Sequence, residues 1–237
     1  MSEPTTQRYG LPLLQPAQAQ KHVTVNEALM RLDGMVNLVL QSVSTQTPPA
    51  TVLDGQCWGV PAAPTGAWVG QTGRIAVGSN GGWVFLPPSR GMRCFVADRG
   101  VEAIHDGTAW IVGAMSMGSR GSGLVTGMAE GEVILGTGSS TVTGVFIPAG
   151  ALVIGAVGRV TATLTGSLTG WRLGTAGALN RFGQGLGKQQ DSWARGMLGS
   201  PMAYYQADPL IVTAEGGTFT GGRISLAVHW LEMRLPN

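Results

Sequence analysis

The sequence predicts a mainly all-β protein that begins with one helix, and three features carry that prediction. Its 237 residues include 38 glycines and 13 prolines without a triplet period, which indicates many tight turns. Short runs rich in β-branched and aromatic residues recur between these turns, as at 73–77 and 83–86. A helical period is clear only near the N-terminus. We therefore expect an N-terminal helix, a small β-meander domain and a C-terminal antiparallel β-sandwich or jelly roll.

Composition argues against several classes of protein. Lys and Arg number 15 against 13 Asp and Glu, so the chain lacks the strong positive field that recruits nucleic acid. Cys57 and Cys94 are too few for a disulfide framework and too far apart for a zinc-ligand pair, so we expect buried thiols and leave their pairing open. The N-terminus resembles no signal peptide, and no apolar run approaches 18 residues. We expect synthesis in the cytoplasm and no membrane insertion.

The predicted helix has the spacing of a heptad seam. Thr24 and Glu27 form a capping-box pattern that places its start near Val25. Apolar residues then follow at alternating steps of four and three: Val25, Leu29, Leu32, Val36, Val39 and Val43. A helix of about 20 residues is marginal alone in water, so this seam needs a partner. Periodicity leaves two partners open: identical helices of other subunits, or this chain's own sheet.

Residues 46–112 form a small domain rich in tryptophan and glycine. Asn80-Gly81 between two apolar runs is a strong hairpin signal, and a second hairpin is expected around 105–108. Tryptophans beside glycine could form a stacking row for a ligand. In so small a β-domain we interpret them as its core.

A domain boundary is expected within 113–123, a Gly/Ser/Met-rich segment with the composition of a linker. Strand patterns return beyond it. Val160, Ala162 and Leu164 alternate with polar residues, and the last strand places apolar residues at every second position from Ile224 to Trp230. The predicted organisation is a helical segment at 1–45, the small β-domain at 46–112, a linker at 113–123 and a β-sandwich at 124–237.

Catalytic motifs are missing from the sequence. It contains no Gly-x-Ser-x-Gly elbow, and the glycine-rich stretch at 183–188 lacks the Ser or Thr of a phosphate loop. His22, His105 and His229 have no second histidine or cysteine at ligand spacing. We therefore expect no catalytic residue, no metal and no cofactor. A pair of carboxylates could still meet in space from distant positions, so a glycosidase stays open.

The most distinctive C-terminal segment is 170–206, which we interpret as a long irregular insertion. Such loops are usually functional or disordered. Between Arg159 and Arg195 the chain holds five basic residues and one acidic residue, Asp191. Aromatic faces, arginines and an acid are the groups that bind carbohydrate, although the same residues could also fill the sandwich ends or a subunit interface. The candidate sugar-binding residues are Trp171, Arg172, Asp191, Trp193, Arg195, Tyr204 and Tyr205.

The N-terminal half resembles a known domain family. The stretch GLPLLQPAQAQKHVTVNEALMRLDGMV at 10–36 is similar to the signature of an uncharacterised domain of tail-fibre and spike proteins from bacteriophages and gene transfer agents. Later Asp-Gly, Gly-Ala-Trp and Gly-Trp units extend the resemblance over 8–112. The resemblance implies an adhesion protein carried on a phage-like particle. It does not extend to the C-terminal domain.

Fibres of this kind are commonly homotrimers, which favours the intersubunit bundle for the heptad seam. The resulting expectation is a virion tail-fibre or spike subunit that binds bacterial cell-surface polysaccharide and contacts other tail or baseplate proteins. The alternatives are a capsule depolymerase and a purely structural connector.

Overall fold

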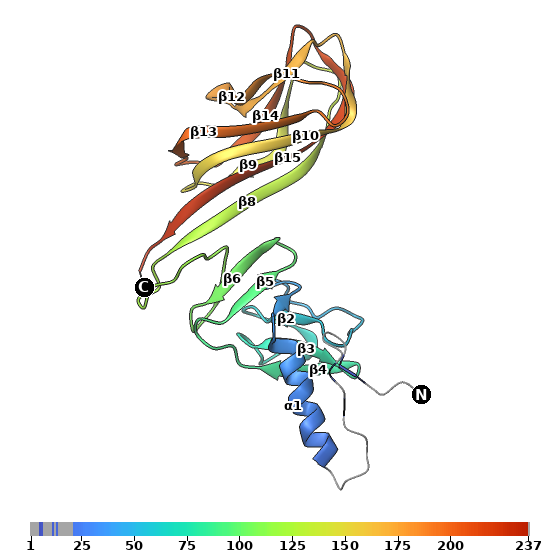
Figure 1. Cartoon of the computed structure of the whole chain (residues 1–237), viewed down its shortest axis with the longest axis vertical. Helices are drawn as coiled ribbons and strands as arrows, with labels where there is room; N and C mark the ends of the chain where they lie inside the picture. Colours follow the sequence, from blue (N-terminus) through green and yellow to red (C-terminus); the bar gives the residue numbers. More distant parts are fainter. Residues whose placement is uncertain (1–4, 7–10, 12, 14–20, 237) are drawn as a thin grey trace. The chain divides into compact units, whose positions relative to one another are not determined.

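The computed structural model describes residues 21–236 together with Thr5, Thr6, Leu11 and Leu13, leaving aside the side chains of 21–24. The protein is mainly β, with 53% strand and 6% helix, as the sequence predicts. It divides into two compact units (Figure 1). Unit 1 comprises Met1–Gly123 with Leu235–Asn237, and unit 2 comprises Leu124–Arg234.

Unit 1 is built on a seven-stranded sheet in the order β4-β3-β2-β1-β5-β6-β7. Its strands are β1 Val39–Leu40, β2 Cys57–Gly59, β3 Ile75–Ser79, β4 Gly82–Leu86, β5 Arg93–Val96, β6 Val101–His105 and β7 Trp110–Val112. The sheet is not a simple meander, because β1 lies at its centre and runs parallel to both β2 and β5. The segment at 1–45 therefore supplies the middle strand of the small β-domain.

Helix α1 spans Lys21–Met35, so the prediction of a helix reaching Val43 is wrong. Asn37 adopts a positive φ of 44°, a left-handed conformation that ends helices. Leu38 and Leu40 are then buried in the core. Burial of these two leucines outweighs the heptad spacing. As a result Val39 lies in β1 and Val43 follows that strand. The predicted start near Val25 is also wrong, because α1 begins at Lys21 and Thr24 therefore lies inside the helix and does not cap it.

The expectation that tryptophans form the core of unit 1 is confirmed for Trp58 and Trp68. Trp58 is 7% exposed and Trp68 is fully buried. Trp83 completes the cluster, with its ring centroid 5.3 Å from each of the other two in edge-to-face contacts. Their rings fill the core with the tilted geometry that aromatic quadrupoles favour. The two cysteines of this unit, Cys57 and Cys94, are buried free thiols.

His105 is a buried titratable group at the end of β6, next to the buried Asp106. It is 3% exposed, its ring lies edge-on to Trp110 at 5.0 Å, and its Nδ1 accepts a hydrogen bond of 3.2 Å from the Gly107 amide. Burial lowers the pKa of His105, and the charge of Asp106 opposes that effect only in part. The folded state therefore favours the neutral imidazole.

We expect acid to destabilise unit 1 through His105. Between the lowered pKa of the folded state and the ordinary value of about 6.5, the unfolded chain binds more protons at this site. Stability is thus complete above about pH 6.5 and falls as the pH decreases through that window. Thermal unfolding followed at several pH values should show this slope in wild type and a flatter one in His105→Gln. A slope in His105→Gln equal to that of wild type would show that groups other than His105 cause the pH dependence.

Unit 2 is an eight-stranded jelly roll. Its strands are β8 Gly123–Ile134, β9 Ser140–Ile147, β10 Leu152–Gly166, β11 Gly170–Thr175, β12 Ala178–Leu186, β13 Trp193–Ala203, β14 Asp208–Glu215 and β15 Phe219–Arg234. They form two four-stranded sheets, β13-β10-β15-β8 and β12-β11-β14-β9. Counted from β8 as the first strand, these orders are 6-3-8-1 and 5-4-7-2, the strand order of a jelly roll.

The core of unit 2 lies between its two sheets. Residues from Ile224 to Trp230 are buried at every second position, as the sequence alternation predicts, and they pack against apolar residues of the opposite sheet such as Leu173 and Val212. The other side of each strand is the outer face of its sheet. Side chains on these outer faces are available for function.

The segment 170–206 is not an irregular insertion, because β11, β12 and β13 occupy most of it. Glycines obscured the strand pattern in the sequence. A Cβ atom at Gly196 would lie 2.0 Å from the carbonyl oxygen of Phe182, and one at Gly174 would lie 2.1 Å from that of Ala178. These glycines permit close passage of neighbouring backbone, at the cost of the alternating side chains that mark a strand.

Candidate functional site

Three of the seven predicted sugar-binding residues lie together at the outer face of the sheet β13-β10-β15-β8. Trp193 begins β13 and pairs directly with Arg159 of β10, which pairs on its other side with Ser225 of β15. Arg195 lies two residues after Trp193, hence on the same face, and pairs with Val157. Directly opposite side chains in antiparallel strands have Cβ atoms about 5 Å apart. The register therefore places one indole beside two guanidinium groups.

The site is a shallow concavity of about 480 Å³ with an exposed aromatic ring. Trp193 is 63% exposed, and the guanidinium carbon of Arg195 lies 5.7 Å from the centre of its ring. Small side chains line part of the hollow. The residues around it are Glu130, Val157, Gly158, Arg159, Trp193, Ala194, Arg195, Ser225, Leu226 and Ala227. The exposed ring of Trp193 can stack on a ligand, and the hydrogen-bonding groups of Arg159 and Arg195 lie beside it.

Asp191 joins this site through Arg159. Its Oδ1 lies 3.7 Å from Nη1 of Arg159, and both side chains are largely exposed. Asp191 holds a positive φ of 67°, a conformation that Asp and Asn tolerate better than most residues. Its amide donates to the carbonyl of Val160 at 2.9 Å, and the Val160 amide donates to the carbonyl of Ser192 at 2.8 Å. These bonds fasten the turn before β13 to β10 and thereby position Trp193.

Trp171 and Tyr204 cannot serve as stacking platforms, which corrects the prediction for both. Trp171 is fully buried in the sandwich core, and its Nε1 donates to the carbonyl of Gly187 at 2.9 Å. Tyr204 is only 9% exposed and belongs to the same core. Tyr205 is 89% exposed but is not among the residues that line the concavity. Trp193 is therefore the aromatic residue of the concavity, whereas Trp171 and Tyr204 belong to the core.

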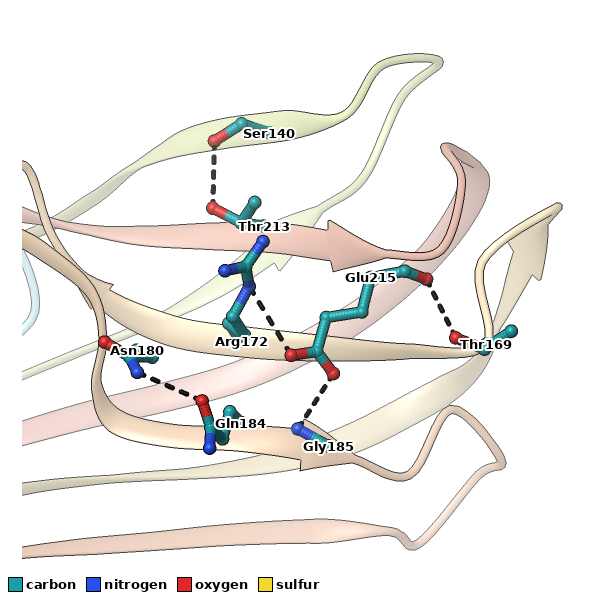
Figure 2. Close-up of polar contacts among 8 residues, drawn as sticks. All are labelled: Ser140, Thr169, Arg172, Asn180, Gln184, Gly185, Thr213 and Glu215. Carbon is teal, nitrogen blue, oxygen red and sulfur yellow. Dashed lines mark hydrogen bonds and ion pairs between the residues drawn. The ribbon is translucent and has the colours of Figure 1, made fainter.

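Arg172 lies on the outer face of the other sheet, where it pairs with Glu215 (Figure 2). Its Nε is 3.5 Å from Oε1 of Glu215, and the second oxygen of that carboxylate accepts from the Gly185 amide at 2.8 Å. The Glu215 carbonyl accepts from the amide of Thr169 at 2.8 Å and from its hydroxyl at 3.1 Å. Glu215 thus ties β12 and β11 to β14, and Arg172 is part of that structural clamp.

The two other charged residues that line the concavity, Arg159 and Glu130, were not among the predicted site residues. Arg159 is on the polar face of β10, and the alternation of that strand in the sequence already placed it there. Glu130 comes from β8, a strand without clear alternation. The spatial order of the strands, which brings β8 and β13 into one sheet, carries no signal in the local sequence.

A second cavity, of about 440 Å³, lies in unit 1 between α1 and the β3–β4 hairpin. Its lining includes the apolar residues Met30, Val77, Val84 and Leu86 and the polar residues Asn26 and Asp54. None of its described lining residues is aromatic. Among the described residues no group of three or more His, Cys, Asp or Glu could hold a metal ion, and no helix is long and apolar enough to cross a membrane. The concavity at Trp193 is therefore the better candidate for a glycan.

Comparison with known proteins finds a family that matches part of unit 1. Residues 25–111 match the family model described as "Protein of unknown function (DUF2793)". This confirms that the N-terminal half resembles a known domain, over a range narrower than the expected 8–112. No curated protein matches the chain. A solved structure titled "Cyanophage Pam1 capsid asymmetric unit" contains a similar chain, with a TM-score of 0.35 and 16% identity over 45% of this chain and 84% of that one. So low a TM-score assigns neither fold nor function.

Proposed function

We propose that this protein is a tail-fibre or spike subunit of a phage-like particle, and that unit 2 binds bacterial cell-surface polysaccharide at the outer face of β13-β10-β15-β8. One observation carries the proposal: a 63% exposed tryptophan flanked by two arginines above a concavity. An exposed aromatic ring beside hydrogen-bonding groups can stack on the apolar face of a ligand while those groups fix the ligand's orientation. The sequence resemblance to fibre and spike domains supplies the biological setting.

The chemistry of the concavity suits a sugar ring. Trp193 offers a flat apolar surface to the C–H face of a pyranose, and covering that surface removes it from water. Arg159 donates to ring or hydroxyl oxygens, while Glu130 accepts from hydroxyl groups. Small residues such as Ser225 and Ala227 leave room for the ring.

Helix α1 supports a homotrimer in this proposal. Val25, Leu32 and Val36 are between 40% and 47% exposed, and Met35 is 36% exposed. Asp33, in contrast, is buried and accepts a hydrogen bond of 2.7 Å from the hydroxyl of Thr6. One side of α1 therefore contacts its own unit, while the apolar stripe of Val25, Leu29, Leu32 and Val36 is partly exposed to solvent. Equivalent helices of two further subunits would cover this stripe.

Trimerisation would suit adhesion, because three weak sugar sites held in one assembly bind a surface with avidity. In this proposal the chain is synthesised in the bacterial cytoplasm and works on the particle, where other tail or baseplate proteins are its partners. The polysaccharide of the host cell is its ligand.

The alternative with a specific observation in its favour is a depolymerase. Glu130 lines the concavity and Asp191 adjoins it, so two carboxylates border one site; a hydrolase would need the bound substrate to bring them within about 10 Å of each other. Incubation of the protein with the polysaccharide that it binds, followed by a reducing-end assay, separates the two functions. New reducing ends that disappear in Glu130→Gln would establish the enzyme. Binding without such release supports the adhesin.

Replacing Trp193 by alanine is expected to weaken polysaccharide binding at least about tenfold, the equivalent of about 1.4 kcal/mol. The measurement is retention of the full-length protein on a panel of purified bacterial capsular and O-antigen polysaccharides. Tyr205→Ala is the matched control, because Tyr205 is an even more exposed aromatic residue outside the concavity. Equal loss in both variants, or no loss in Trp193→Ala, would remove this site from the proposal.

A further inference from the structure

We propose that the sugar bound at Trp193 carries an anionic group, a carboxylate or a phosphate, and that Asp191 occupies the place of that group when no ligand is bound. The inference rests on the proposed function and narrows its ligand to an acidic glycan. It assigns to Asp191 the opposite of the usual role of an acid in a sugar site, since Asp191 would compete with the ligand instead of accepting its hydroxyl groups.

The charges around Trp193 support an anionic ligand. Arg159 and Arg195 flank the ring, and Asp191 is the one described carboxylate that pairs with either of them. Arg195 makes no ion pair with a described acidic residue. The surroundings of the ring therefore keep an excess of one positive charge. Arginine is the side chain best suited to two parallel hydrogen bonds with a carboxylate or phosphate.

Glu130 lies across the concavity from Trp193 and Arg195. It lies on β8, which the strand order separates from β13 by two intervening strands. At about 4.8 Å between neighbouring strands, that separation is about 14 Å, beyond the screening length of about 8–10 Å at physiological salt, whereas the separation from Arg159 on β10 is about 10 Å. Glu130 can therefore contact the far end of a bound oligosaccharide without repelling an acidic group beside Trp193.

The pair between Arg159 and Asp191 is easily exchanged. The atoms are 3.7 Å apart, and the side chains are 60% and 76% exposed. Ion pairs so exposed contribute little to stability, so releasing Asp191 to solvent opposes ligand binding only weakly. A ligand carboxylate that stacks its sugar on Trp193 gains the ring contact as well as Arg159. The ligand thus has a contact that Asp191 lacks, and the exchange favours the complex.

Asp191→Asn is the decisive variant, because asparagine keeps the shape of the side chain and tolerates the same left-handed backbone. Removing the competing charge should tighten binding of an acidic polysaccharide by about twofold to fivefold, the range expected for losing one exposed ion pair. Arg159→Gln should weaken that binding at least about tenfold. The matched controls are Glu132→Gln and Arg223→Gln. They alter a similar exposed ion pair, 3.7 Å long, whose two residues do not line the concavity.

The probes are the acidic and neutral members of the polysaccharide panel. Each polysaccharide is tested untreated, after carboxyl reduction and after dephosphorylation. The inference predicts that full-length protein retains acidic members, that one of these two treatments abolishes retention, and that added salt weakens it. Loss on carboxyl reduction identifies a uronate-type ligand, and loss on dephosphorylation identifies a phosphorylated one.

Two results would overturn the inference in different ways. If Trp193→Ala loses binding while Asp191→Asn binds more weakly than wild type, the ligand is neutral and Asp191 accepts from its hydroxyls; the proposed function then stands. If Trp193→Ala binds as well as wild type, or no polysaccharide is retained, the proposed function fails together with the inference.

Discussion

Replacing Trp171 by alanine is expected to lower the free energy of unfolding of unit 2 by about 3–5 kcal/mol, the range for large aromatic residues in a packed core. The ring is fully buried among residues of both sheets, and its Nε1 donates to the Gly187 carbonyl. Alanine would leave a cavity and an acceptor without its donor. Gly158 lies so close that a Cβ atom added there would be 3.5 Å from the Trp171 ring, and a residue without a side chain cannot fill the space.

Urea denaturation followed by circular dichroism measures this loss. Trp193→Ala is the matched control, because the same chemical change at a 63% exposed position should stay within about 0.5 kcal/mol of wild type. The two tryptophans should therefore separate, with Trp171 acting on stability and Trp193 on binding. Equal destabilisation by both variants would contradict the assignment of Trp193 to the surface.

Placing an aspartate at Leu32 is expected to convert a trimer of three 24.5-kDa chains into monomers. Leu32 is 47% exposed at the centre of the apolar stripe on α1, so the substitution spares the core of unit 1. In a bundle it would bury an unpaired charge at each of three equivalent positions, which costs several kcal/mol per assembly. Light scattering of the purified protein measures the change in mass.

Leu53→Asp is the control for this experiment, because Leu53 is a 52% exposed leucine of the same unit that lies outside α1. Its mass should equal that of wild type. A wild-type protein that is already a monomer would contradict the proposed bundle and leave the stripe of α1 without an assigned partner. A trimer that survives Leu32→Asp would move the interface to another surface.

The sequence was informative where local periodicity and packing agree. The alternation from Ile224 to Trp230 predicted the buried face of β15, and the polar positions of β10 predicted the outward side chain of Arg159. It was misleading for α1, because a heptad spacing extends through Val43 while the buried Leu38 and Leu40 draw the chain into a strand. The spacing of apolar residues within a segment does not show which of its sides will pack against the rest of the chain.

The residues of the candidate site were likewise predicted only in part from the sequence. Trp171 and Trp193 both lie in a glycine-rich stretch and look alike in sequence, yet one fills the core and the other is exposed. Each ring's burial depends on which face of its own strand the residue occupies, and Trp171 in β11 and Trp193 in β13 belong to strands of different sheets. Arg172 was expected to face a ligand but pairs with Glu215, a residue 43 positions away that β14 brings beside it. Long-range strand pairing decides such contacts.

The most direct test of the proposed function is a crystal structure of the full-length protein with an oligosaccharide cut from a polysaccharide that it binds. The account predicts a sugar ring stacked on the exposed face of Trp193, with an acidic group beside Arg159 and the Asp191 side chain displaced. An oligosaccharide bound instead in the cavity between α1 and the β3–β4 hairpin, with Trp193 uncovered, would contradict it.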